Sequence, residues 1–145
     1  MSKDANFLSP EDELEIVEAI RKAEKDTSGE IRVHIEKKAS GDAFDRAKEV
    51  FHILKMDETA LKNGVLIYLA VDDHSFIICG DKGINDVVSD DFWNCTKDIM
   101  AAEFKKGNFK KGLVDGIQRA GEQLQKYFPS VHDDKDELTN EISNG

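Results

Sequence analysis

The chain has 145 residues, which is the usual length of one domain with a single core. Apolar residues make up 39% of it and charged residues 34%, a balance that provides a core and excludes a disordered chain. The net charge of −10 favours solubility and attracts cations, whereas it repels nucleic acid and anionic membranes. The sequence therefore predicts neither nucleic acid nor a membrane as a partner.

The first residues lack the basic and then apolar pattern of a signal peptide. The longest apolar run, residues 65–71, is far shorter than the roughly 18–20 residues that span a bilayer. We therefore expect a cytoplasmic location.

The first predicted element is a helix that begins at Pro10. Ser9 suits the N-cap, Pro10 suits the first helical position, and Asp12 can complete a capping box. The apolar residues that recur at helical spacing, and that we expect to face the core, are Leu14, Val17, Ile20 and Ala23. Gly29 ends this helix. Residues 30–36 then alternate between apolar and polar, which predicts a strand with one buried face.

A second amphipathic helix is predicted to start near Asp42. Its apolar stripe is formed by Phe44, Ala47, Phe51 and Leu54. Residues 65–71 are apolar without alternation, which is typical of a strand covered on both faces in the middle of a sheet. Asp72 and Asp73 form a tight turn, and residues 74–80 return as the second strand of a hairpin.

Residues 81–91 are rich in Gly, Asp and Asn and predict a loop. A helix is expected to follow from Ser89 or Asp90. Its predicted inward residues are Phe92, Cys95, Ile99 and Met100. The last helix stops at Pro129. Its Gly116 and Gly121 each cost about 1 kcal/mol of helix stability, so we expect close helix packing there.

The order helix, strand, helix, strand, strand, helix, helix predicts the fold class. It is an α/β single-domain sandwich, with a mixed β-sheet that contains a parallel βαβ crossover and a hairpin, and with helices on both faces. We divide the chain into an N-terminal arm (1–9), the folded domain (10–129) and an acidic disordered tail (130–145).

Five segments in chain order resemble the TPM domain. Residues 27–33 resemble its T-G-x-E-I-x-V start, and residues 63–67 resemble its N-G-V-L strand. The turn at Asp72 and Asp73, the G-x-G loop at residues 80–84, and the F-x-x-G-[DN]-[FY]-x-x-G-[LI] segment at residues 104–113 follow.

This resemblance implies a compact α/β sandwich, with calcium or another divalent cation near the loops at the strand ends in some members. A plant thylakoid-lumen member of the family is linked to photosystem II repair and to acid phosphatase activity.

Aspartates in the loops are the candidate metal ligands, because hard cations prefer several oxygen ligands. They are Asp72 and Asp73 at the hairpin tip, Asp81 and Asp86 after the hairpin, and Asp90 and Asp91 before the next helix. We expect two groups at opposite ends of the sheet, with Asn63 and Gly64 beside the 81–91 loop. The alternative is that these aspartates are turn formers and helix caps on an acidic surface.

The sequence thus favours a TPM-domain module that binds calcium or magnesium and has an accessory or interaction role, with the protein partner unknown. The alternative is a weak metal-dependent phosphatase that acts on phosphomonoesters through metal-activated water. No catalytic residue can be named. Cys79 and Cys95 do not form a C-x-x-C pair, so we expect two small buried residues, and we expect all four histidines to be structural or exposed.

Overall fold

The computed structural model describes residues 8–39, 41–89, 91–129 and 143–144. The helices are α1 (Pro10–Glu24), α2 (Ala43–Ile53), the 3₁₀ helix η2 (Met56–Glu58), α3 (Lys82–Asn85), α4 (Asn94–Lys105) and α5 (Phe109–Tyr127). The strands are β1 (Glu30–Glu36), β2 (Gly64–Ala70), β3 (Ser75–Gly80) and β4 (Ser143–Asn144).

The strands form one mixed sheet in the order β3-β2-β1-β4. β1 is parallel to β2, with Glu30 opposite Gly64 and Glu36 opposite Ala70, and α2 lies in the connection between them. β2 and β3 form an antiparallel hairpin. The predicted α/β sandwich, with its parallel crossover and its hairpin, is confirmed.

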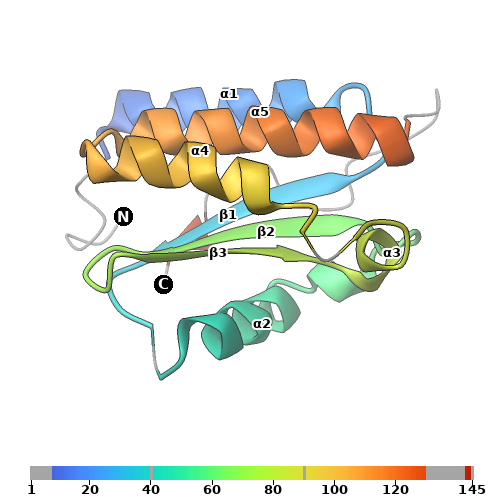
Figure 1. Cartoon of the computed structure of the whole chain (residues 1–145), viewed down its shortest axis with the longest axis horizontal. Coiled ribbons are helices and arrows are strands. Elements are labelled where there is room, and N and C mark those ends of the chain that lie inside the picture. The colour runs from blue at the N-terminus through green and yellow to red at the C-terminus, as the bar shows by residue number, and fades with distance from the viewer. Residues whose placement is uncertain (1–7, 40, 90, 130–142, 145) are drawn as a thin grey trace.

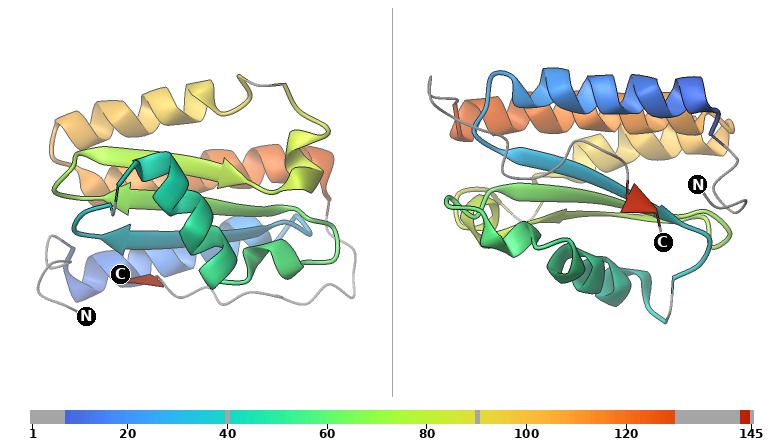
Figure 2. Two further views of the ribbon diagram at one scale, coloured as in Figure 1. Left: turned by 90° about the horizontal axis from the view of Figure 1, so that it is seen from below. Right: turned by 180° about the vertical axis from the view of Figure 1, so that it is seen from behind.

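Helices cover both faces of the sheet. α1, α4 and α5 lie on one face, and α2 lies on the other (Figures 1 and 2). The larger apolar cluster lies beneath α1 and α5, and the smaller one lies beneath α2. All seven residues of β2 are buried between these layers, which explains its unbroken apolar sequence.

The start of α1 is as predicted, and its inward face is partly so, since Ile20 is fully buried and Ala23 packs against the core. Asp12 N donates to Ser9 Oγ (3.1 Å), and Ser9 N donates to Asp12 Oδ2 (3.3 Å). Leu14, however, is 70% exposed, and Ile16 is fully buried in its place. The buried stripe is rotated because α1 packs against α5 as well as against the sheet.

The prediction that β1 buries only its apolar face is wrong. Glu30, His34 and Glu36, on the alternate face, are also buried. α2 covers that face and supplies Arg46 as a partner for Glu36, so a polar strand face becomes part of the interior.

The segment after the hairpin also differs from its prediction. Within the predicted loop, residues 82–85 form the short helix α3, and α4 begins only at Asn94. Cys95 is exposed, so its predicted inward position is wrong. Thr96 and Met100 are the buried residues of α4, whereas Cys79 on β3 is partly buried.

The two glycines of α5 mark close helix contacts, as predicted. A Cβ on Gly121 would lie 2.6 Å from Ala23 Cβ, and one on Gly116 would lie 2.4 Å from Met100 Sδ. α5 therefore approaches α1 and α4 more closely than a larger residue would permit.

The arm and the tail fall mostly outside the described residues. Of the predicted arm, residues 1–7 lie outside them, whereas Leu8 is buried and Ser9 caps α1. Of the predicted tail, only residues 143–144 are described, and they pair with β1. No helix in the described ranges is long and apolar enough to cross a membrane.

Candidate cation site

The end of the sheet where β1 and β2 begin and β3 ends brings two loops together. Asp81 N donates to Gly64 O (2.9 Å), and Gly83 N donates to Lys62 O (2.8 Å). The segment that leaves β3 thus lies directly on the segment that enters β2. The expectation that these two segments share one end of the sheet is confirmed.

Asp81 occupies the junction between β3 and α3. Its Oδ1 accepts a hydrogen bond from Lys82 N (2.7 Å), so the carboxylate caps α3. Its Oδ2 is buried and has no hydrogen-bond partner among the described residues. A buried carboxylate oxygen without a partner costs free energy, which a cation or a donor can recover.

Two further buried polar side chains belong to this end of the sheet. Asn63 is 1% exposed, and its Nδ2 donates to Ser28 Oγ (3.3 Å). Asn63 Oδ1 and Trp93 Nε1 are both buried without a hydrogen-bond partner in the described part of the chain. Trp93 Nε1 lies 3.6 Å from the position of a Cβ on Gly80, next to Asp81. This end of the sheet therefore has two buried oxygens of the kinds that bind cations, and one buried N–H of the kind that donates to a water or an anion.

The other predicted ligands of this group point elsewhere. Asp86 is exposed, and its Oδ2 lies 3.7 Å from Lys82 Nζ. Asp91 is exposed and accepts a hydrogen bond from Ser89 Oγ (2.6 Å). Asp90 lies outside the described residues. Among the described aspartates of this group, only Asp81 has a buried carboxylate oxygen without a hydrogen-bond partner.

Asp72 and Asp73 lie at the opposite end of the sheet, as expected, and both are engaged with the loop after β1. Asp73 Oδ2 accepts a hydrogen bond from Ala39 N (2.9 Å). Asp72 Oδ2 lies 4.0 Å from Lys37 Nζ, and Asp72 N donates to Lys37 O (2.8 Å). These aspartates hold the hairpin turn against the neighbouring loop.

Within residues 8–39, 41–89 and 91–129, no three His, Cys, Asp or Glu side chains are grouped closely enough to hold a metal ion. A cation at Asp81 would therefore need oxygen donors other than a cluster of carboxylates, such as amide oxygens and water. Such a donor set fits calcium or magnesium, which accept carboxylate, amide and water oxygens.

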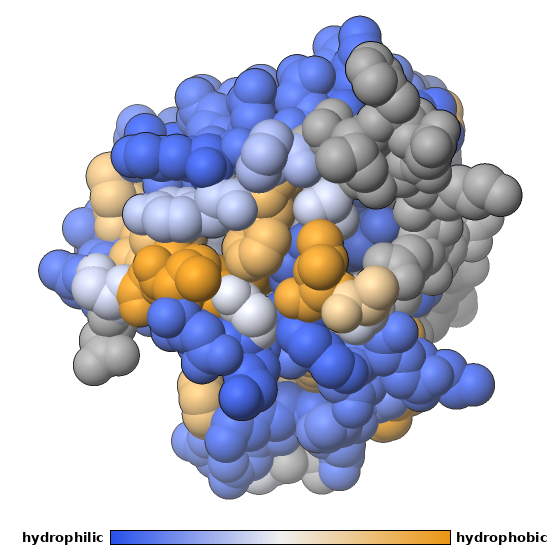
Figure 3. Space-filling view, turned by 90° about the vertical axis from the view of Figure 1, so that its right-hand side faces the viewer, coloured by the Kyte–Doolittle hydropathy of each residue, from blue (hydrophilic) through white to orange (hydrophobic). Residues whose placement is uncertain are grey.

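The surface around this site is partly apolar. Figure 3 shows this end of the molecule, where apolar side chains gather in the middle of a face framed by polar ones. Leu61 and Val87, which flank the site in the sequence, are 55% and 51% exposed.

A buried polar network lies beneath α2, and the sequence analysis did not predict it. Glu36 accepts hydrogen bonds from Arg46 Nε (2.9 Å) and Arg46 Nη2 (2.9 Å), and it also accepts one from the Tyr68 hydroxyl. His34 Nε2 lies 3.1 Å from Glu36 Oε1, and its ring stacks on Tyr68 with a centroid distance of 5.9 Å. The sequence signal for this network was Glu36, a charged residue on the strand face that the predicted crossover helix would cover.

The network shifts the pKa values of its members in opposite directions. Burial raises the pKa of Glu36, but hydrogen bonds from Arg46, Tyr68 and His34 outweigh it and hold this pKa at about 2. Burial lowers the pKa of His34, and burial together with the Glu36 hydrogen bond raises that of Tyr68. At neutral pH the cluster therefore contains a carboxylate held by a guanidinium, which joins β1 to α2.

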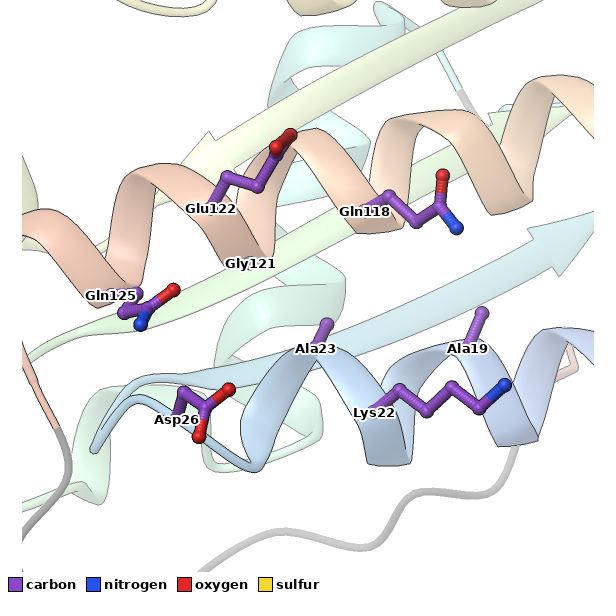
Figure 4. A pocket seen from close by; sticks show the side chains of 8 residues that line it. All are labelled: Ala19, Lys22, Ala23, Asp26, Gln118, Gly121, Glu122 and Gln125. Carbon is purple, nitrogen blue, oxygen red and sulfur yellow. The ribbon is translucent and has the colours of Figure 1, made fainter.

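A polar groove of about 420 Å³ runs between α1 and α5. Its floor lies where Ala23 and Gly121 bring the two helices together. Lys22 lies along its own helix and Glu122 points away from α1, so the charged groups do not converge on one point (Figure 4). The groove follows from close helix packing, and we assign no ligand to it.

Comparisons with known proteins agree with this structure. The model of the TPM domain family matches residues 1–123. The BA42 protein of the psychrophilic bacterium Bizionia argentinensis is 64% identical, with a TM-score of 0.92 and complete coverage of both chains. No protein with a curated description matches the chain.

Two more distant solved structures share the fold. The N-terminal domain of the cg2496 protein of Corynebacterium glutamicum is 13% identical, with a TM-score of 0.66 over 83% of this chain and 76% of that one. An N-terminal domain from P. gingivalis is 21% identical, with a TM-score of 0.67 over 87% of this chain and 81% of that one. The family match covers most of the sequence, and the chain belongs to the TPM domain family.

Proposed function

We propose that this TPM domain binds a divalent cation, calcium or magnesium, at the start of β2, with Asp81 and Asn63 as its protein ligands. The observation that supports this most directly is the buried Asp81 Oδ2, which has no hydrogen-bond partner among the described residues. The net charge of −10 attracts cations to the molecule as a whole. The proposed role is that of an accessory or interaction module.

The number of protein oxygens sets the expected affinity. Calcium takes 6–8 oxygens and magnesium takes six, so two side chains leave most positions to water. We therefore expect weak binding, with Kd of about 10⁻⁴–10⁻³ M. Asp72 and Asp73 are weaker candidates, because Asp73 already accepts a backbone hydrogen bond and Asp72 lies near a lysine.

The test is an NMR titration of the whole ¹⁵N-labelled chain with magnesium chloride and with calcium chloride. Amide shifts are expected at residues 62–64 and 80–86. Asp81→Asn should weaken binding by about tenfold or more, because it removes the charge of the ligand, while an asparagine still caps α3.

Asp86→Asn is the matched control, since it removes one exposed carboxylate from the same segment. It should leave the affinity nearly unchanged. Shifts concentrated at residues 72–73, or equal effects of the two variants, would contradict the assignment to Asp81.

Hydrolysis of phosphomonoesters is the alternative activity, and it rests on the family resemblance. A bound cation could supply activated water, with Asp81 and Asn63 holding the ion. Cys79 is poorly suited as a nucleophile, because burial raises the pKa of its thiol. Turnover of a phosphomonoester that is lost on chelation and in Asp81→Asn would favour this alternative over binding alone.

A further inference from the structure

A separate hollow lies at the other end of the sheet, where β2 ends and β3 begins. It has a volume of about 250 Å³ and is lined by residues of β2, the turn after it, β3, α4 and the start of α5. We call it the hairpin-end pocket. The lining residues that matter here are Phe76, Phe104, Phe109, Ala101, His74 and Lys105.

The walls of the hairpin-end pocket are aromatic. The rings of Phe76 and Phe104 meet edge to face with centroids 5.0 Å apart, and those of Phe104 and Phe109 stack at 5.6 Å. All three rings pack against the larger core, so the pocket is formed before any ligand arrives.

The turn between α4 and α5 fixes these rings. Gly107 adopts a φ of 82°, and Asn108 Nδ2 donates to Glu103 Oε1 (3.1 Å). A Cβ on Gly112 would lie 2.5 Å from the Phe104 ring, so a glycine is needed where that ring rests on α5. The F-x-x-G-N-F-x-x-G sequence at residues 104–112 therefore supplies the two phenylalanines of one pocket wall and the glycines that position them.

Among the residues that line the pocket, the one charged side chain is a lysine, Lys105, although the protein is acidic. Lys105 and His74 line it and are exposed, and the described residues offer Lys105 no ion-pair partner. The nearby carboxylates are used elsewhere: Asp72 lies near Lys37, Asp73 bonds a backbone N–H, and Glu103 bonds Asn108. An anionic group at the mouth would therefore meet Lys105.

We propose that the hairpin-end pocket binds a small aromatic carboxylate, with its ring against the wall of phenylalanine rings and its carboxylate at Lys105. A volume of about 250 Å³ is below the roughly 300–1,000 Å³ of sites for drug-sized ligands, so a single ring is the appropriate size. Edge-to-face and stacked contacts favour an aromatic ring over an aliphatic chain.

The test titrates the whole ¹⁵N-labelled chain with phenylacetate, with its neutral analogue phenylacetamide, and with acetate. Phenylacetate should shift amides of residues 69–76 and 101–109 and bind more tightly than phenylacetamide by about fivefold. Acetate should give no shifts there, because it lacks the ring.

Two variants separate the ring from the charge. Ala101→Leu places a larger side chain in the pocket and should abolish binding of both aromatic probes, with thermal unfolding showing that the fold is retained. Lys105→Gln should remove the preference for phenylacetate, whereas Lys97→Gln, at an exposed position of α4 outside the pocket, should not.

Equal affinity for phenylacetate and phenylacetamide would overturn the proposal, as would binding that survives Ala101→Leu. Shifts of the same amides with protein concentration alone would assign the pocket to a second copy of the chain and would also overturn it. Absence of binding by either aromatic probe would overturn it as well.

Discussion

Arg46 on α2 binds Glu36 on β1 through two hydrogen bonds, from Nε to Oε2 and from Nη2 to Oε1, each 2.9 Å long. The Glu36 side chain is only 6% exposed, and that of Arg46 is 20% exposed. Because the carboxylate is cut off from water, the guanidinium replaces its hydration. The pair joins the crossover helix to the strand that precedes it.

Breaking this pair should destabilise the fold strongly. Arg46→Met keeps an apolar stem but leaves Glu36 as a buried charge, so the free energy of unfolding should fall by about 3 kcal/mol. Arg21→Met is the control, because Arg21 pairs with Glu18 on an exposed surface and should change stability by less than about 1 kcal/mol. Urea unfolding measures the loss of unfolding free energy in both variants. Equal losses would show that the buried Glu36 pair stabilises the fold no more than the exposed pair does.

The same carboxylate makes stability depend on acid pH. The pKa of Glu36 is about 2 in the folded protein against an ordinary value of 4.5, so its contribution is complete above pH 4.5 and is lost as the pH falls from there to 2. The loss should be about 2–3 kcal/mol. His34 adds a change of the same sign at higher pH, because its pKa is also lowered on folding.

Glu36→Gln should be less stable at pH 7 but should show a flatter dependence of unfolding free energy on pH between 5 and 2. Urea unfolding at a series of pH values gives both curves. If the wild type and the variant lose stability in parallel, other carboxylates carry the acid sensitivity.

The local sequence was sufficient to predict the strands of the sheet, but it was insufficient to predict the buried polar residues on one of its faces. The apolar run at β2 identifies a strand covered on both faces without any knowledge of its neighbours, and all seven of its residues are buried. The burial of Glu36 depends instead on where α2 places Arg46, ten positions later. Alternation along β1 alone therefore pointed to an exposed face.

The sequence predicted where the candidate site lies on the sheet, but it did not predict all the side chains that are buried there. Hairpin geometry puts Asp81 beside Gly64 and puts Asp72 at the far end, as the hydrogen bonds of β2 and β3 confirm. The buried amide of Asn63 could not be predicted, because its burial depends on packing from several segments. The capping role of Asp81 corresponds to the alternative reading of these aspartates.

The close contact between α1 and α5 predicts that a methyl group added at Gly121 lowers the stability of the fold. Gly121→Ala would place a Cβ 2.6 Å from Ala23 Cβ and 3.0 Å from Ala23 Cα, so the helices must separate. The expected loss is about 1–2 kcal/mol, although alanine favours a helix by about 1 kcal/mol. Gly116→Ala should cost less, because it meets the flexible side chain of Met100.

Ala23→Gly in the Gly121→Ala background tests the cause of that loss. It removes the opposing methyl group and should recover part of the stability, even though Ala23→Gly alone destabilises α1. Thermal unfolding of the three variants completes the cycle. Additive losses would mean that the two positions do not meet.

The two cysteines should differ in reactivity, although the sequence analysis expected both to be buried. Cys95 is exposed, and Arg119 Nη2 lies 3.1 Å from its Sγ, whereas Cys79 is partly buried on β3 and burial raises the pKa of its thiol. Because the thiolate is the reacting species, iodoacetamide should label Cys95 at least about tenfold faster. Mass spectrometry of the native protein over time measures this. Cys95→Ser should remove the fast phase of labelling. In urea the labelling rates of the two cysteines should converge, because the difference comes from the fold. Faster labelling of Cys79 would contradict the exposed position of Cys95.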